Sequence, residues 1–69
     1  MIKSELAIII KLKRKAMGMT QEKLAEKMET SRTNVVKWET GSREPEWKNF
    51  VALCVALELT VEDFIEEVE

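Results

Sequence analysis

The chain has 69 residues and a mass of 8.0 kDa, which is enough for one small domain with a single core. Hydrophobic residues make up 45% and charged residues 35%, so we expect a folded domain and not a disordered chain. One cysteine, no histidine and no tyrosine remove most groups that serve metal binding and acid–base or covalent catalysis. We therefore expect a binding module that is not an enzyme and that holds no cofactor or metal. The sequence shows no signal-peptide pattern and no apolar run long enough to span a membrane. We therefore expect a cytoplasmic protein that does not bind a membrane.

Charge is divided unevenly along the chain, although the net charge is only −2. Residues 1–43 hold ten basic and five acidic side chains, whereas residues 44–69 hold one basic side chain and eight acidic ones. Such an asymmetry is typical of a small globule with one basic and one acidic face. Phosphate contacts would be sought on the basic half, although two ordinary solvated faces would give the same pattern.

The apolar spacing predicts five short helices and no strand. Their expected ranges, in chain order, are 4–16, 21–28, 31–40, 46–57 and 60–68. Ser4, Thr20, Ser31 and Thr60 are favourable N-cap residues, and Gly18, Gly41 and Pro45 mark boundaries.

Each predicted helix gathers its apolar residues on one side. In the first helix Leu6, Ile9, Ile10 and Met17 form one stripe, while Ile8 and Leu12 lie off it and need a second partner surface. The other expected core residues are Leu24, Ala25, Met28, Val35, Trp38, Phe50, Leu53, Cys54, Leu57, Val61, Phe64, Ile65 and Val68. Trp47, between two charged residues, is expected to be half-exposed.

The second and third helices are separated only by Glu29-Thr30-Ser31. A turn this short makes two helices cross steeply, as in a helix-turn-helix, and the small Ala25 fits that crossing. Val35 and Trp38 would fix the third helix on the core. Its opposite face would then be free to enter the major groove of DNA.

The ordered set of motifs resembles the Cro/C1-type helix-turn-helix family, which comprises phage-repressor-like and xenobiotic-response-element-type bacterial regulators. The resemblance covers about residues 10–65 and is carried by Thr20-Gln21-Glu22-Lys23-Leu24-Ala25-Glu26-Lys27-Met28, Ser31-Arg32, Val35, Trp38-Glu39, Gly41-x-x-x-Pro45 and Leu53-x-x-Ala56-Leu57-Glu58-Leu59-Thr60-Val61-x-Asp63-Phe64. It implies an all-α fold: a compact five-helix bundle like the lambda-repressor DNA-binding domain. Residues 1–69 would form one domain, with the helix-turn-helix at about 20–40.

The resemblance also implies a role for particular residues. Those expected to read bases are Arg32, Thr33, Val36 and Lys37. Those expected to contact phosphates are Gln21, Asn34, Thr40, Ser42 and Arg43. Arg14 and Glu39 match a partly buried salt bridge that orients the recognition helix in some family members.

One position departs from the family pattern. Glu29 replaces the usual glycine of the turn, where a left-handed backbone is often required, at a cost on the order of 1 kcal/mol. This acidic residue also lies close to the expected DNA-facing surface, so the turn geometry or the affinity for DNA is in question.

The leading interpretation is a sequence-specific transcriptional regulator, expected to repress by binding double-stranded DNA as a homodimer on a palindromic or pseudo-palindromic operator. The pairing surface stays open: the end of the fourth helix, the fifth helix, or Ile8 with Leu12. Packing of Ile8 and Leu12 against the fifth helix of the same chain would explain these two residues equally well. The alternative is a protein-interaction module on the same fold, such as an antitoxin-like or adaptor protein. Its acidic last helix would bind a basic partner through Glu62, Asp63, Glu66, Glu67 and Glu69.

Overall fold

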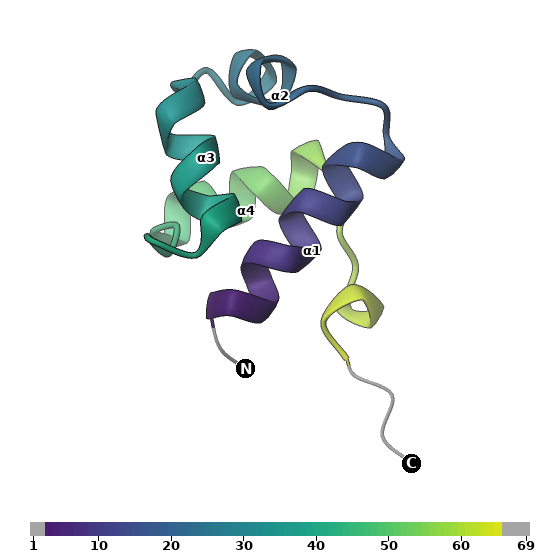
Figure 1. Cartoon of the computed structure of the whole chain (residues 1–69). Helices are drawn as coiled ribbons and strands as arrows, with labels where there is room; N and C mark the ends of the chain where they lie inside the picture. The colour runs from purple at the N-terminus through teal and green to yellow at the C-terminus, as the bar shows by residue number, and fades with distance from the viewer. Residues whose placement is uncertain (1–2, 66–69) are drawn as a thin grey trace.

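The computed structural model describes residues 3–65, which form a compact all-α fold (Figure 1). The elements are α1 (Lys3–Ala16), α2 (Gln21–Met28), α3 (Arg32–Thr40), α4 (Trp47–Ala56) and the 3-10 helix η1 (Val61–Phe64). The ranges of the first four helices agree with the predicted ones to within one residue at each end. Over this described range, no helix has both the length and the apolar character needed to cross a bilayer.

One apolar core holds the four α-helices together. Its fully buried side chains come from all four and from the residue after α4: Ile10, Leu24, Val35, Leu53 and Leu57. In Figure 1, α2 and α3 occupy the upper left of the molecule, and η1 lies at the lower right, beyond α1. The helix-turn-helix is therefore far from η1.

The predicted N-caps of the second and third helices are confirmed. The Thr20 hydroxyl accepts a hydrogen bond from the Lys23 N–H at 3.0 Å, and the Ser31 hydroxyl accepts one from the Asn34 N–H at 3.2 Å. Each bond satisfies one of the N–H groups that a helix leaves unpaired in its first turn.

The C-terminal ends use the left-handed backbone conformation. Gly18 and Gly41 adopt φ values of 73° and 81°, as expected of glycines that end helices. Glu29 and Glu58 do the same with φ values of 58° and 55°, although they carry side chains. The left-handed turn predicted at Glu29 is thus present, whereas the one at Glu58 carried no sequence signal.

The fifth predicted helix is wrong over the described residues. Only Val61–Phe64 is helical, as a single 3-10 turn, and Ile65 is already extended; Val68 and the rest of 66–69 lie outside the described residues. Val61 and Ile65, expected to face inward, are 74% and 62% exposed. A nine-residue helix is marginal on its own, and acids at i and i+4 repel one another, so this acidic segment gains little from a longer helix.

The apolar surface of the other helices also differs from the prediction in places. In α1, Ala7 is buried although it was not assigned to the core. Met17 lies just after α1 and is exposed instead of completing the stripe. Phe50 and Cys54, both expected in the core, are half-buried. Trp47 was expected to be half-exposed, and its exposure is 76%.

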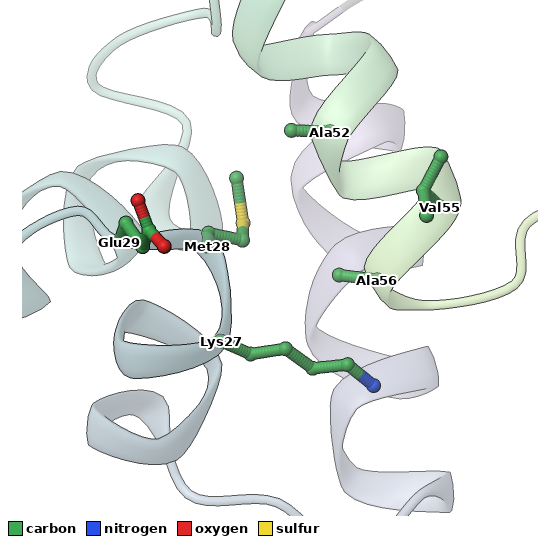
Figure 2. A pocket seen from close by; sticks show the side chains of 6 residues that line it. All are labelled: Lys27, Met28, Glu29, Ala52, Val55 and Ala56. Carbon is green, nitrogen blue, oxygen red and sulfur yellow. The ribbon is translucent and has the colours of Figure 1, made fainter.

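A shallow apolar hollow of about 360 Å³ lies between the end of α2 and the second half of α4 (Figure 2). It is lined by Lys27, Met28, Glu29, Ala52, Val55 and Ala56. Glu29, the departure in the turn, therefore borders this hollow beside α4.

Candidate nucleic-acid interface

Helix α3 has one face fixed in the body of the protein. Val35 is fully buried, and Trp38 and Glu39 are buried to 3% and 8% exposure. These three side chains follow the i, i+3, i+4 spacing of one helix face, so they define the side of α3 that cannot reach a ligand. The remaining side chains of α3 are the ones available to DNA.

The free face of α3 carries most of the predicted base-reading residues. Arg32, Thr33 and Lys37 are exposed, and none of them takes part in an ion pair among the described residues. Val36 is half-buried, so less of it is available than its predicted outward position implies. The face thus offers two cationic donors, one hydroxyl and part of an aliphatic side chain, the groups that recognise base edges in a major groove.

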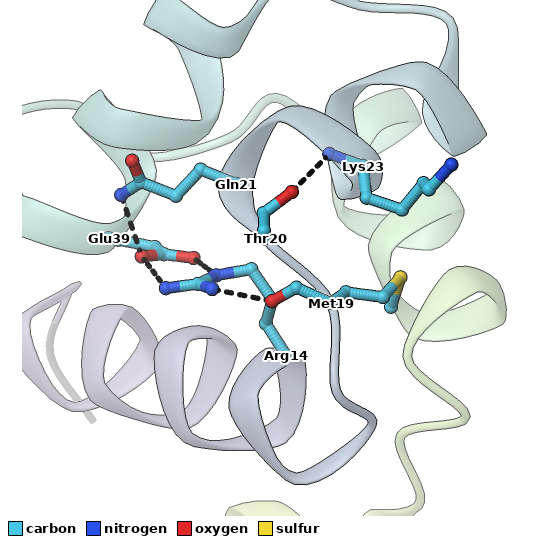
Figure 3. Close-up of polar contacts among 6 residues, drawn as sticks. All are labelled: Arg14, Met19, Thr20, Gln21, Lys23 and Glu39. Carbon is cyan, nitrogen blue, oxygen red and sulfur yellow. Dashed lines mark hydrogen bonds and ion pairs between the residues drawn. The ribbon is translucent and has the colours of Figure 1, made fainter.

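A buried ion pair ties α1 to α3, and the structure brings Arg14 and Glu39 together as the resemblance implied (Figure 3). Arg14 Nη2 donates to Glu39 Oε1 at 3.0 Å, and Nε donates to Oε2, so the contact is bidentate. Arg14 Nη1 also donates to the Met19 carbonyl at 2.7 Å, which fixes the segment before α2. The bidentate pair thus links α1 to α3, and the bond to Met19 links it to the segment before α2.

Gln21 is part of the same network, a connection that the sequence did not indicate. Its Nε2 donates to Glu39 Oε1 at 3.1 Å, and Figure 3 shows its carbonyl oxygen pointing away from that carboxylate. A phosphate accepts hydrogen bonds, and the side-chain carbonyl oxygen of Gln21 cannot donate one to it. A phosphate contact at Gln21 is left to the second N–H of the amide and to the backbone N–H groups of the first turn of α2.

Three other predicted phosphate contacts already have local hydrogen bonds. Asn34 Nδ2 donates to the Thr30 hydroxyl at 2.9 Å, across the turn between α2 and α3. The hydroxyls of Thr40 and Ser42 lie 3.2 Å and 3.5 Å from the Lys37 carbonyl oxygen, at the end of α3. Thr40 and Ser42 would have to exchange local partners in order to donate to a phosphate, whereas the second N–H of the Asn34 amide is not used by its bond to Thr30.

Arg43 is the cationic member of the predicted phosphate contacts, and no ion pair within residues 3–65 involves it. It is exposed in the loop after α3, and its backbone N–H donates to the Lys37 carbonyl at 3.3 Å. This bond positions the loop next to the end of α3. Arg43 thus adds a third exposed cation beside Arg32 and Lys37.

The acidic half of the chain is only partly removed from this surface. Glu44 and Glu46 border a polar hollow of about 150 Å³ together with Asn34, Arg43 and Asn49. The acids of η1, in contrast, lie on the far side of the molecule from α3 (Figure 1). Long-range repulsion of DNA by η1 is therefore small compared with the effect of the two glutamates near Arg43.

Comparison with known proteins gives the same picture. The family model HTH_3, described as Helix-turn-helix, matches residues 10–64. The clp gene regulator ClgR from C. glutamicum has a TM-score of 0.82 and 25% identity, over 91% of this chain and 81% of that one. The restriction-modification controller protein C.AhdI from Aeromonas hydrophila has a TM-score of 0.81 and 25% identity, over 91% and 96%. A search of curated proteins found no match.

A third solved structure contains DNA. The controller protein C.Esp1396I, solved as a tetramer with its natural 35 base-pair operator, has a TM-score of 0.78 and 34% identity, over 90% of this chain and 82% of that one. The family match spans most of the chain, and the solved regulators share its fold. The chain therefore belongs to the Cro/C1-type helix-turn-helix family of DNA-binding transcriptional regulators.

Proposed function

We propose that the protein is a sequence-specific repressor that binds a two-fold symmetric operator as a homodimer, with α3 in the major groove. The observation that carries this proposal is the division of α3 into a locked face and a free one. Val35, Trp38 and Glu39 hold the helix in place, while Arg32 and Lys37 stay exposed and unpaired within the described chain.

The exposed side chains of α3 fit the chemistry of base edges. Arg32 and Lys37 can donate to O6 and N7 of guanine, and the Thr33 hydroxyl can donate or accept. The exposed part of Val36 is suited to contact with a thymine methyl group. In this arrangement Arg43 contacts the phosphate backbone of the DNA. It positions α3 along the groove without reading the base sequence.

Two copies are needed because one helix reads little DNA. The nine residues of α3 extend about 13 Å, so a single copy covers only a few base pairs of one groove. Two copies related by a two-fold axis would read half-sites about 34 Å apart, one turn of DNA. The operator complex of the C.Esp1396I tetramer supports operator binding by an oligomer here.

Repression is the simplest consequence of such binding. A dimer seated on an operator that overlaps a promoter blocks access of the polymerase, and this requires no further domain. In vitro transcription from a promoter that contains the selected site would then fall as the protein is added.

The test is selection of binding sites from a random duplex library with the purified protein, followed by affinity measurements on the enriched duplex. We expect a two-fold symmetric motif. Arg32→Ala and Lys37→Ala should each weaken specific binding by about 10-fold or more, since a bidentate base contact discriminates by about 1–3 kcal/mol. Lys13→Ala is the matched control, because it removes the same charge from a side chain that lies 3.7 Å from Asp63 in η1, away from α3.

The outcomes separate the proposal from its alternative. Equal losses for Lys37→Ala and Lys13→Ala would mean that α3 attracts DNA by charge alone. A library that shows no enrichment would argue against operator binding and in favour of a protein-interaction module. The next experiment would then be a binding assay with a basic peptide, in which substitutions at Glu62 and Asp63 should weaken the complex.

A further inference from the structure

The outer side of α1 carries a stripe that is both apolar and basic. Its members follow the i, i+3, i+4, i+7 spacing of one helix face: Ile8, Lys11, Leu12 and Lys15. All four are exposed, Ile8 by 56% and Leu12 by 61%. The single turn of η1 leaves these two aliphatic side chains uncovered within the described chain. We call these four residues the α1 stripe.

A hollow of about 210 Å³ opens beside the α1 stripe, between α1 and η1 (Figure 1). It is lined by Glu5, Ile8, Ile9, Asp63, Phe64 and Ile65. Ile8 thus belongs both to the stripe and to the hollow, and Ile65 on the other wall is 62% exposed. An apolar side chain that enters the hollow from outside would contact the same surface as a helix that lies along the stripe.

The two lysines of the α1 stripe are available to a partner. Neither Lys11 nor Lys15 takes part in an ion pair within residues 3–65, whereas Lys13, on the η1 side of the helix, lies 3.7 Å from Asp63. Glu5 is in the first turn of α1, on the hollow. The outer side of α1 therefore runs from an acidic end to a basic end.

We propose that the α1 stripe binds an acidic amphipathic helix of a partner protein, in antiparallel orientation. Aliphatic side chains of that helix cover Ile8 and Leu12, and its N-terminal half brings carboxylates to Lys11 and Lys15. The same orientation places the positive N-terminal end of the partner helix beside the negative C-terminal end of α1. The site requires neither DNA nor a second copy of the chain, so it goes beyond the proposed function.

The distribution of charge favours this occupant over two others. A second copy of the α1 stripe brings its own two lysines to the first, and like charges repel. An anionic bilayer attracts Lys11 and Lys15 but repels Glu5 and the acids of η1, which packs beside α1. A helix whose acids are confined to one half meets the lysines and avoids Glu5.

The probe is a fluorescein-labelled helical peptide about four turns long, with leucines along one face and glutamates only in its N-terminal half. We expect fluorescence anisotropy to give a dissociation constant of about 10–100 µM, because the stripe extends only about 11 Å along α1 and the interface is small. A peptide with the same glutamates in its C-terminal half should bind about 3-fold more weakly. Lysine in place of each glutamate should weaken binding by about 10-fold or more.

Substitutions in the chain locate the contact. Leu12→Glu and Lys11→Glu should each weaken binding of the acidic peptide by about 10-fold or more. The matched controls are Val55→Glu on α4, at a side chain 75% exposed, and Lys27→Glu on α2, and each should change affinity by no more than about 2-fold. All four side chains are exposed, and circular dichroism would verify that each variant is folded.

Other results overturn the proposal. Equal losses for Leu12→Glu and Val55→Glu, or no binding of the acidic peptide up to about 1 mM, would show that the α1 stripe has no such partner. Dimers in sedimentation equilibrium that Leu12→Glu disrupts would assign the stripe to a second copy instead. Binding to phosphatidylserine vesicles, without binding to the peptide, would assign it to a membrane surface.

Discussion

Glu29 holds a backbone conformation that its side chain disfavours. Its φ of 58° ends α2, where the N–H of Thr30 donates to the Ala25 carbonyl at 2.9 Å and the N–H of Glu29 donates to that of Glu26 at 3.1 Å. These bonds complete a Schellman-type end, which usually has glycine at the left-handed position. The helix-turn-helix thus keeps the usual geometry of its turn and stores strain of about 1 kcal/mol.

Glu29→Gly should relieve that strain. We expect the free energy of unfolding to rise by about 0.5–1 kcal/mol, which raises the Tm by about 2–8 °C for a domain of this size. Glu29→Ala is the control, because it removes the carboxylate but keeps a Cβ in the left-handed conformation, and it should give no such gain. Thermal unfolding followed by circular dichroism measures both. Equal gains for the two variants would show that the negative charge, and not the backbone, was unfavourable.

We expect the buried pair of Arg14 and Glu39 to serve orientation more than stability. Both side chains are largely removed from water, at 8% and 2% exposure, so the cost of desolvation offsets much of their attraction. The bond from Gln21 adds a third member that depends on the same carboxylate. The network thus connects the ends of three helices at the side of the helix-turn-helix.

Replacing the pair separates these two effects. Glu39→Ala should lower the free energy of unfolding by about 3–5 kcal/mol, because it leaves the Arg14 guanidinium buried without its partner. The double substitution Arg14→Met with Glu39→Leu should recover most of this loss, since it leaves no unpaired charge. The double variant should nevertheless bind the selected operator more weakly, by about 10-fold, because Gln21 and α3 lose their common anchor. Urea unfolding and operator titration check the two parts; full operator affinity in the double variant would assign the network to stability alone.

At the scale of elements, η1 depends on the ionisation of one carboxylate. Asp63 accepts the Thr60 N–H at 2.7 Å, and Lys13 lies 3.7 Å away. The hydrogen bond from Thr60 and the charge of Lys13 lower the pKa of Asp63 below its ordinary value of 3.8. The ionised form is therefore the one that the fold favours.

The sign of the pH dependence follows from this shift. A carboxyl group with a lowered pKa in the folded state adds stability above its unfolded pKa, and this is lost as pH falls through the folded value. We expect η1 to loosen below about pH 4. In Asp63→Asn this part of the pH dependence should be absent. The free energies of unfolding of wild type and variant should therefore converge at about pH 2. Carboxyl ¹³C NMR titration of Asp63 gives the pKa directly; a value above that of an unfolded peptide would contradict the argument.

The sequence predicted four helices well because each has a periodic apolar face and a recognisable end. Ser31 and Gly41, for example, bound α3 by the physical chemistry of capping. The last segment has apolar residues at helical spacing but also many acids, and its capping box at Thr60 and Asp63 starts only one 3-10 turn. The spacing of apolar residues alone does not show how little apolar surface of the core remains for Val61 and Ile65 to pack against.

The candidate site was predictable to a similar extent. The exposed positions of Arg32, Thr33 and Lys37 follow from the helix period once the buried face is known. The local bonds of Asn34, and the bond from Gln21 to Glu39, depend on distances across turns and between helices, which the spacing of residues does not give.

At the scale of the whole molecule, charge is partly segregated in space, although Glu44 and Glu46 lie near Arg43. Arg32 and Lys37 lie on the exposed side of α3 and Arg43 in the loop after it, while the acids of η1 lie on the far side of the molecule (Figure 1). A chain with a net charge of −2 can therefore still present a local positive surface to DNA. Its affinity should depend steeply on salt, because neutralised phosphates release counterions.

The salt dependence distinguishes a residue that contacts phosphate from one that reads bases. The logarithm of affinity falls with the logarithm of salt concentration with a slope of about −0.9 per phosphate contact. Arg43→Ala removes one contact per copy, so in a dimer the magnitude of this slope should decrease by about 2, and affinity should fall equally on all sequences. Lys37→Ala should instead reduce the preference for the selected site over random duplex. Fluorescence anisotropy at several salt concentrations, on both duplexes, measures these quantities. If Lys37→Ala changes the slope and Arg43→Ala changes the preference, then the loop after α3, and not α3 itself, reads the sequence.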